Sequence, residues 1–148
     1  MKIAVASDEK TQLTDFVVEQ LRQRGHEVLL YGPLAGENLP WTLASEKLAD
    51  SVAGGQADEG VLFCYTGTGA SMAANKVPGI RAALCADAQT ARGARWWNDA
   101  NVLVMSLRAT STEVAKEILD AWFAETVRPE EIATIDQLKE IEARHAAT

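Results

Sequence analysis

The sequence predicts an α/β fold, with a single doubly wound (Rossmann-like) parallel sheet, helices on both faces and a C-terminal helical tail. Short apolar runs typical of buried strands alternate with longer segments whose apolar residues recur every three or four positions. The second pattern is typical of helices that cover a sheet. Short connections containing glycine or proline join the two kinds of segment, which indicates βαβ units.

The first quarter of the chain contains two expected strands and one helix. Residues 2–6 are an apolar, β-prone run. Apolar residues recur at helical spacing over 13–21, and Gly25 marks the stop of that helix. Residues 26–31 are a second apolar run, which predicts a strand. Glycines and prolines over 32–40 then indicate a surface loop.

The central part of the chain predicts a helix, a strand and a Gly-rich turn. Apolar residues repeat every four positions over 41–52, and a pair of glycines ends that helix. Residues 60–64 form the third expected strand. The Gly-rich turn over 65–71 separates it from a short helix expected at 72–76.

The remaining elements follow the same alternation. Residues 80–84 and 102–105 are short apolar runs and predict strands, with a helix between them at about 88–97. Apolar residues line one face of a helix over 114–122 and suggest a final helix over 132–141.

Length and composition limit the classes of function. A chain of 148 residues fits one domain, 1–148, with a helical tail at 126–148. The net charge of −7 argues against a nucleic-acid partner, and no apolar run is long enough to predict a membrane span. The N-terminus shows no secretory leader, and two cysteines are too few for a disulfide scaffold. A cytoplasmic location is therefore expected.

The candidate binding residues lie at one edge of the predicted sheet. Ligands of such sheets bind beyond the carboxyl ends of the strands. This rule brings together Ser7-Asp8-Glu9, residues 64–71, and the segments that follow Cys85 and Met105.

The segment 64–71, Cys-Tyr-Thr-Gly-Thr-Gly-Ala-Ser, is the most informative stretch. Its glycines allow close approach of backbone to a ligand, and the helix that follows offers unpaired N–H groups to an anion. It lacks the Gly-Lys-Ser/Thr of a P-loop and the third glycine of a dinucleotide fingerprint. By itself it is equally compatible with a plain strand-to-helix turn. Cys64 likewise fits either an inert buried thiol or a thiolate base at a helix N-terminus.

Longer motifs carry a resemblance to a known family. Residues 67–85 read Gly-Thr-Gly-Ala-Ser-Met-Ala-Ala-Asn-Lys-Val-Pro-Gly-Ile-Arg-Ala-Ala-Leu-Cys, residues 91–92 Ala-Arg, and residues 98–103 Asn-Asp-Ala-Asn-Val-Leu. These strongly resemble the RpiB/LacA/LacB family of sugar-phosphate isomerases, the ribose-5-phosphate isomerase B type, and the likeness extends from Met1 to about Trp122. The resemblance implies an aldose–ketose isomerase that uses no metal or other cofactor. It also implies a homodimer or homotetramer with its sites between subunits.

The resemblance also implies a role for each site residue. Cys64 matches the base that removes the proton beside the carbonyl, because Ala70 stands where another branch of the family has a glutamate. Thr66 matches the threonine beside that base. Donors from the loop would steady the enediolate. The residues expected to bind substrate are Asp8, Glu9, Tyr65, Gly67, Thr68, Gly69, Ser71, Trp97, Asn98 and Arg108.

Several positions depart from the family pattern. Glu9, Ala86 and Trp97 each stand where the family has a histidine. The family histidine that Trp97 replaces is the one that opens the sugar ring. The C-terminal arginines that grip phosphate are absent from the divergent tail, which leaves Arg108 as the aligned cation. These changes make the pocket less attractive to a dianion and predict weak ribose-5-phosphate turnover. A substrate that is already open-chain, or that opens unaided, would need no ring-opening base.

Two functions remain open on the sequence. The leading hypothesis is an isomerase acting on a small sugar or sugar phosphate through an enediolate. The alternative is a non-catalytic, sugar-binding paralogue of the same fold. Trp41, Trp96 and Trp122 are expected in the core or at an interface, and His26 and His145 at the surface.

Overall fold

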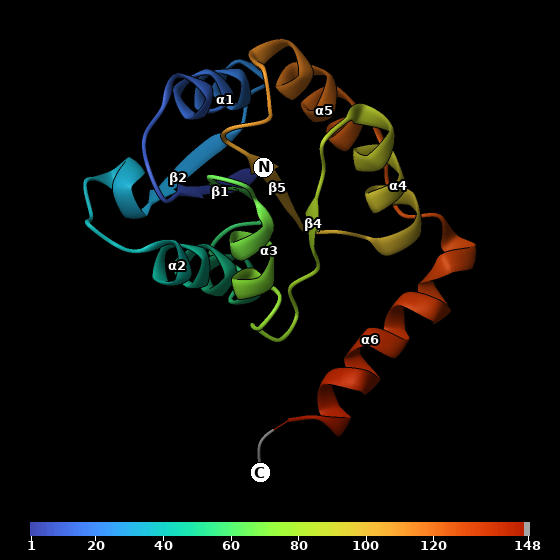
Figure 1. Ribbon diagram of the computed structural model, residues 1–148. Helices are drawn as coiled ribbons and strands as arrows, with labels where there is room; N and C mark the ends of the chain where they lie inside the picture. The colour runs from blue at the N-terminus through green and yellow to red at the C-terminus, as the bar shows by residue number, and fades with distance from the viewer. Residues whose placement is uncertain (147–148) are drawn as a thin grey trace.

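The computed structural model describes residues 1–146, so the last two residues of the expected tail lie outside it. Its strands form one parallel, five-stranded sheet in the order β2-β1-β3-β5-β4 (Figure 1). The parallel α/β architecture predicted from the sequence is confirmed. The strands are β1 (Lys2–Ser7), β2 (Glu27–Tyr31), β3 (Glu59–Cys64), β4 (Ala82–Leu84) and β5 (Val102–Ser106).

Helices cover both faces of this sheet. α1, α4 and α5 lie on one face, and α2 and α3 on the other, while α6 extends away from the body (Figure 1). Single 3-10 turns occur at Gly32–Ala35 and Pro129–Glu131. The helices are α1 (Gln12–Gln23), α2 (Trp41–Ala53), α3 (Thr68–Ala74), α4 (Ala88–Asn98), α5 (Thr112–Ala124) and α6 (Ile132–Arg144).

The expected bounds of two elements were wrong. α3 begins at Thr68, inside the segment expected to be a turn, because Gly67 adopts a left-handed conformation with φ +83° and reverses the chain at once. β4 begins at Ala82, two residues after the expected start at Ile80. The Arg81 N–H donates to the Asn101 side chain at 2.8 Å, and the Ala82 N–H donates to the Asn75 side chain at 2.8 Å. These two backbone N–H groups are therefore bonded to side chains and not to a neighbouring strand.

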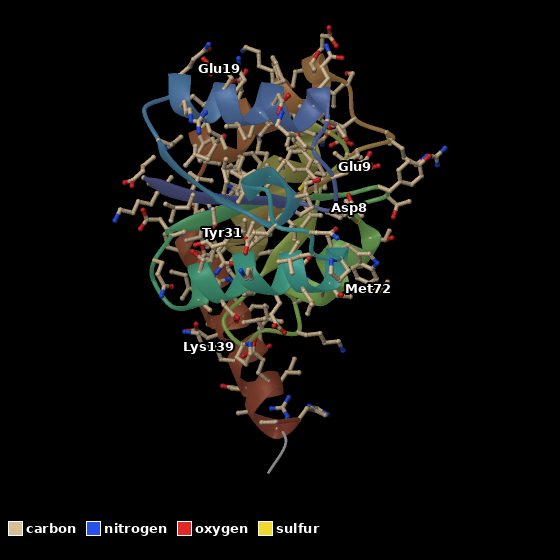
Figure 2. The ribbon with its side chains drawn as sticks, turned by 90° about the vertical axis from the view of Figure 1, so that its left-hand side faces the viewer. Asp8, Glu9, Glu19, Tyr31, Met72 and Lys139 are labelled. Atoms are coloured by element: carbon tan, nitrogen blue, oxygen red, sulfur yellow. The ribbon has the colours of Figure 1, made fainter. Side chains whose placement is uncertain are left out.

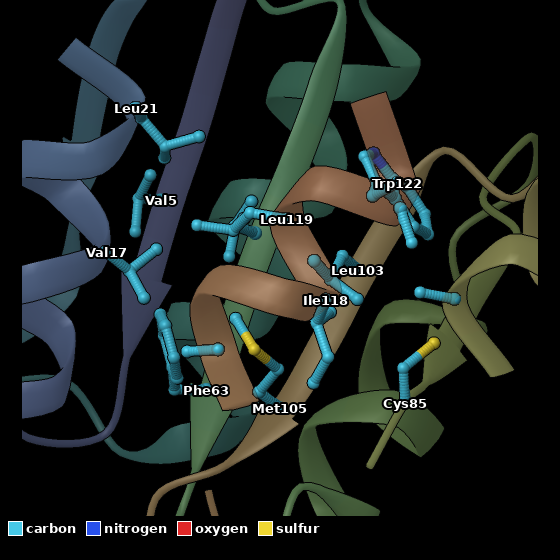
Figure 3. Packing of buried hydrophobic residues seen from close by; sticks show 14 of the residues in the cluster. Val5, Val17, Leu21, Phe63, Cys85, Leu103, Met105, Ile118, Leu119 and Trp122 are labelled. Carbon is cyan, nitrogen blue, oxygen red and sulfur yellow. The ribbon is translucent and has the colours of Figure 1, made fainter. Parts of the chain in front are cut away.

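The two faces of the sheet carry side chains of different size. Along β1, Ile3 and Val5 face the α1/α5 side, whereas Ala4 and Ala6 face α2 and α3. The first side holds most of the large buried residues, and Trp122 of α5 lies in this cluster near Leu103 of β5 (Figure 3). This confirms the expectation that Trp122 belongs to the core.

A buried polar network ties the amino edge of the sheet to α4 and α5. Glu59 accepts a hydrogen bond from the Trp122 indole N–H at 2.8 Å and lies 3.2 Å from the Arg95 guanidinium. Arg95 also donates to the carbonyl of Ala100 at 2.6 Å and covers the Trp122 ring at 5.0 Å. Since Glu59 is only 8% exposed, each charge depends on the other for compensation.

α6 contains no buried residue, and its Ile132, Leu138 and Ile141 side chains remain exposed. The Gly79 N–H, in the loop before β4, donates a hydrogen bond to the Glu142 carboxylate of α6 at 3.3 Å. Within residues 1–146, no helix is long and apolar enough to cross a membrane.

Glu59→Ala is expected to lower the free energy of unfolding by about 3 kcal/mol, because it leaves the Arg95 charge and the Trp122 N–H without their partner. Urea denaturation followed by circular dichroism measures the change. Asp15→Ala is the control, since the Lys10–Asp15 pair is exposed and its loss should have no measurable effect. Equal stability of Glu59→Ala and the native chain would show that the network contributes nothing.

Candidate active site

The carboxyl ends of four strands place the predicted site residues along one edge of the sheet. The register pairs Ser7 of β1 with Phe63 of β3, and Cys64 with Ser106 of β5, while Leu84 of β4 pairs with Val104. Asp8 and Glu9 follow β1 directly and lie on this edge, as does Met72 of α3 (Figure 2). The expected juxtaposition of the β1 end with the 64–71 segment is confirmed.

Cys64 is the best-positioned candidate nucleophile or base at this edge. Its side chain is 5% exposed, and its sulfur accepts hydrogen bonds from the Gly67 N–H at 3.1 Å and the Ala70 N–H at 3.4 Å. Both donors come from the first turn of α3, where backbone N–H groups have no partner within the helix.

The tight turn after Cys64 requires glycine at position 67. A Cβ there would lie 2.5 Å from the Leu84 side chain and 3.3 Å from the Met105 backbone, and the positive φ adds strain for any other residue. Beside it, the hydroxyls of Thr66 and Thr68 are 2.8 Å apart and exposed to solvent. The loop thus presents hydroxyl and amide donors around the cysteine.

Tyr65 and Arg108 stand together at the mouth of the site. The Tyr65 side chain is 62% exposed, and the Arg108 guanidinium lies 5.8 Å from its ring centroid. Arg108 also lines a pocket of about 230 Å³ with Thr66, Ser106 and Thr110. The other lining residues are Leu84, Cys85, Ala86 and Ala109.

Asp8 and Glu9 differ in their surroundings. One carboxylate oxygen of Asp8 is buried and has no hydrogen-bond partner within residues 1–146, so it is available to a ligand hydroxyl. Glu9 is exposed, and its backbone is held by the Ser7 hydroxyl, which donates to the Glu9 carbonyl at 2.6 Å. Ser71 is half-buried on α3.

Trp97 and Asn98 do not join this group within one chain. Both lie at the end of α4, which runs from the carboxyl edge back to the amino edge of the sheet. Asn98 lines a pocket with Arg81 and Ala100, which adjoin the starts of β4 and β5. The five residues of β5 alone span about 13 Å between the two edges. Trp97 is 51% exposed and lines a groove of about 610 Å³ along β4.

The two cysteines have different environments. Cys85 is fully buried, and burial, with a smaller effect of the Asp87 charge, raises the pKa of its thiol to about 12. It therefore stays a neutral thiol near pH 7. Cys64 instead has two amide donors on its sulfur.

Three residues at this edge were not predicted. The Trp41 indole lies against Gly69, where an added Cβ would come within 3.0–3.2 Å of its ring. Leu84 contacts the Gly67 turn, and the Ser106 hydroxyl donates to the Tyr65 carbonyl at 3.1 Å. Trp41 was expected in the core or at an interface, and no local motif signals its contact with the loop. Among the described residues, no cluster of His, Cys, Asp and Glu is placed to hold a metal ion.

Known proteins resemble this chain in sequence and in fold. The profile of the Ribose/Galactose Isomerase family matches residues 3–141. The chain is 42% identical over 106 residues to ribose-5-phosphate isomerase B of Escherichia coli (strain K12), covering 72% of this chain and 71% of that protein. It is 37% identical over 124 residues to a D-erythrulose-4-phosphate isomerase of Pectobacterium atrosepticum, covering 82% of each.

A solved structure extends the comparison to nearly the whole chain. Ribose-5-phosphate isomerase B of Clostridium thermocellum superposes with a TM-score of 0.92 at 35% identity, covering 99% of this chain and 100% of that one. The corresponding Thermotoga maritima protein gives 0.87 at 36% identity, covering 94% and 97%. Sequence, profile and fold agree, and the chain belongs to the ribose/galactose isomerase family.

Proposed function

We propose that this protein interconverts the aldose and ketose forms of a short, open-chain sugar phosphate, with Cys64 as the base. The observation that carries the proposal is the Cys64 sulfur, which receives two backbone N–H groups at the substrate edge of the sheet. The relatives named above are isomerases of sugar phosphates, which favours this activity over the non-catalytic binding protein.

The reaction follows from the groups around Cys64. The thiolate takes the proton from the carbon beside the carbonyl, and the electron pair of that C–H bond forms the C=C bond of an enediolate. The carbonyl oxygen becomes the negatively charged oxygen, which the Thr66 hydroxyl and the amides of the 67–71 turn stabilise. Return of the proton from sulfur to the neighbouring carbon, with proton exchange between the two oxygens, completes the isomerisation.

The residue at position 97 supports a substrate without a ring. An indole neither accepts nor donates a proton near neutral pH, so Trp97 cannot assist ring opening. In a four-carbon sugar phosphorylated at O4, the hydroxyl that would close a five-membered ring is esterified, and the aldehyde stays available without a base. The Pectobacterium atrosepticum relative, named for such a substrate, agrees with this choice.

The position of Asn98 supports a site shared between two copies of the chain. Asn98 lies at the opposite edge of the sheet from Cys64 in the same chain, and Trp97 lines the groove along β4. β4 is an edge strand beside a groove, and Leu84 and Trp97 expose apolar surface there. In an isologous dimer formed through this surface, Asn98 of each copy would lie near Cys64 of the other, which gives two equivalent sites.

Cys64→Ser is expected to lower turnover at least about 100-fold while leaving the fold intact, because the hydroxyl is a much weaker base than the thiolate. Cys85→Ser should change turnover little, since that thiol stays neutral. Steady-state rates with deuterium uptake from heavy water measure both. Equal losses from the two substitutions would assign Cys64 to packing.

A shared site predicts complementation between two inactive variants. Mixing equal amounts of Cys64→Ser and Asn98→Ala, after dissociation and reassembly, should restore about a quarter of the native rate, because half of the dimers carry one intact site. Light scattering checks that dimers form. No recovery in a mixture that contains heterodimers, or a monomer at micromolar concentration, would refute the shared site.

The preferred substrate is expected to be a tetrose 4-phosphate. For ribose 5-phosphate, the native kcat/KM should fall below the common enzyme range of about 10⁴ M⁻¹s⁻¹, and Trp97→His should raise it. Deuterium entry at C1 or C2, followed by NMR for both sugars, measures the preference. Efficient turnover of ribose 5-phosphate by the native chain would overturn it.

A further inference from the structure

We propose that Tyr65 is a positioning residue that holds the Arg108 guanidinium over the pocket of Thr66, Ser106 and Thr110, where it binds the phosphate group of the substrate. The inference rests on the proposed function for the identity of the substrate. The chemical class of ligand, a phosphate monoester or inorganic phosphate, follows from the pocket itself.

The Tyr65 backbone is held rigidly against β5. Its carbonyl accepts the Arg108 N–H at 3.0 Å and the Ser106 hydroxyl at 3.1 Å, and the Leu107 N–H donates to the Cys64 carbonyl at 3.0 Å. These bonds tie the turn that follows β5 to the end of β3. The Cα and Cβ atoms of Tyr65 therefore have a defined position between Cys64 and Thr66, the proposed catalytic residues.

The Arg108 side chain has an aromatic neighbour and no carboxylate. Within residues 1–146, Arg24, Arg81, Arg92 and Arg95 each form an ion pair with an acidic side chain, whereas Arg108 forms none, as is also true of Arg22, Arg128 and Arg144. Its guanidinium lies 5.8 Å from the Tyr65 ring centroid. A cation–π contact orients the guanidinium without using its N–H donors, so the donors stay available to an anion.

Most other polar side chains of the pocket that Arg108 lines already form hydrogen bonds within the protein. The Ser106 hydroxyl already donates to Tyr65 and accepts the Ala109 N–H at 3.1 Å, and the Thr66 hydroxyl pairs with Thr68. Leu84, Ala86 and Ala109 supply apolar walls. Arg108 is the charged group of this pocket, and its orientation determines how well a phosphate is bound.

The exposed position of both side chains sets the expected size of the effect. Tyr65→Ala should weaken binding of inorganic phosphate about two- to fivefold, and raise KM for the sugar phosphate by the same factor with kcat nearly unchanged. Tyr65→Phe keeps the ring and should restore native values. Isothermal titration calorimetry of the full chain with inorganic phosphate gives the dissociation constant without any turnover.

Four proteins form the decisive set: the native chain, Tyr65→Ala, Arg108→Ala and the double variant. If Tyr65 acts through Arg108, Tyr65→Ala has no further effect on phosphate binding once Arg108 is removed. Lys116→Ala is the matched control for loss of one positive charge, because Lys116 is an exposed residue of α5 paired with Asp120. It should leave phosphate binding unchanged.

Three results would overturn the inference: native phosphate binding in Tyr65→Ala, equal weakening in Tyr65→Phe, or independent effects of the two substitutions. Failure of the proposed function has a different signature. If no sugar phosphate is turned over, but phosphate binding depends on Arg108 and on the Tyr65 ring, the anion pocket stands and the isomerase assignment fails.

Discussion

The left-handed conformation of Gly67 is the constraint on which the site depends. It lets the chain reverse directly after β3, so that α3 begins at Thr68 and its first turn directs N–H groups at the Cys64 sulfur. The same turn lies against the Met105 backbone and the Leu84 side chain, which leaves no room for a Cβ. One backbone conformation thus connects the sheet edge, the start of α3 and the hydrogen bonds to the Cys64 sulfur.

The opposite edge of the sheet depends on a different interaction. Glu59, Arg95 and Trp122 form a buried, charged network that fixes α4 against β3 and α5. α4 carries Trp97 and Asn98 at its end, so the network that holds α4 also helps to position these two residues.

The departures from the family pattern converge on the same chemical change. Position 97 holds a tryptophan instead of the family's histidine, and the C-terminal arginines are absent; the resemblance implies weaker ring opening and weaker anion binding. Cys64, Thr66 and the glycine turn, to which the proposed function assigns the proton transfer, are present. Both proposals made above, a small acyclic phosphate as substrate and Arg108 oriented by Tyr65 as its positive charge, are consistent with these departures.

The sequence by itself determined the parallel α/β fold, the edge that carries the site, and Cys64 with its Gly-rich turn. Strand alternation and the Gly-Thr-Gly motif are local signals, and the rule that ligands bind at strand carboxyl ends converts them into a location. Only the tertiary structure decided the start of α3, the contact of Trp41 with Gly69, and the separation of Asn98 from Cys64. The physical reason is that these depend on backbone dihedrals and on distances between residues remote in sequence. Hydrophobic periodicity carries no information on either.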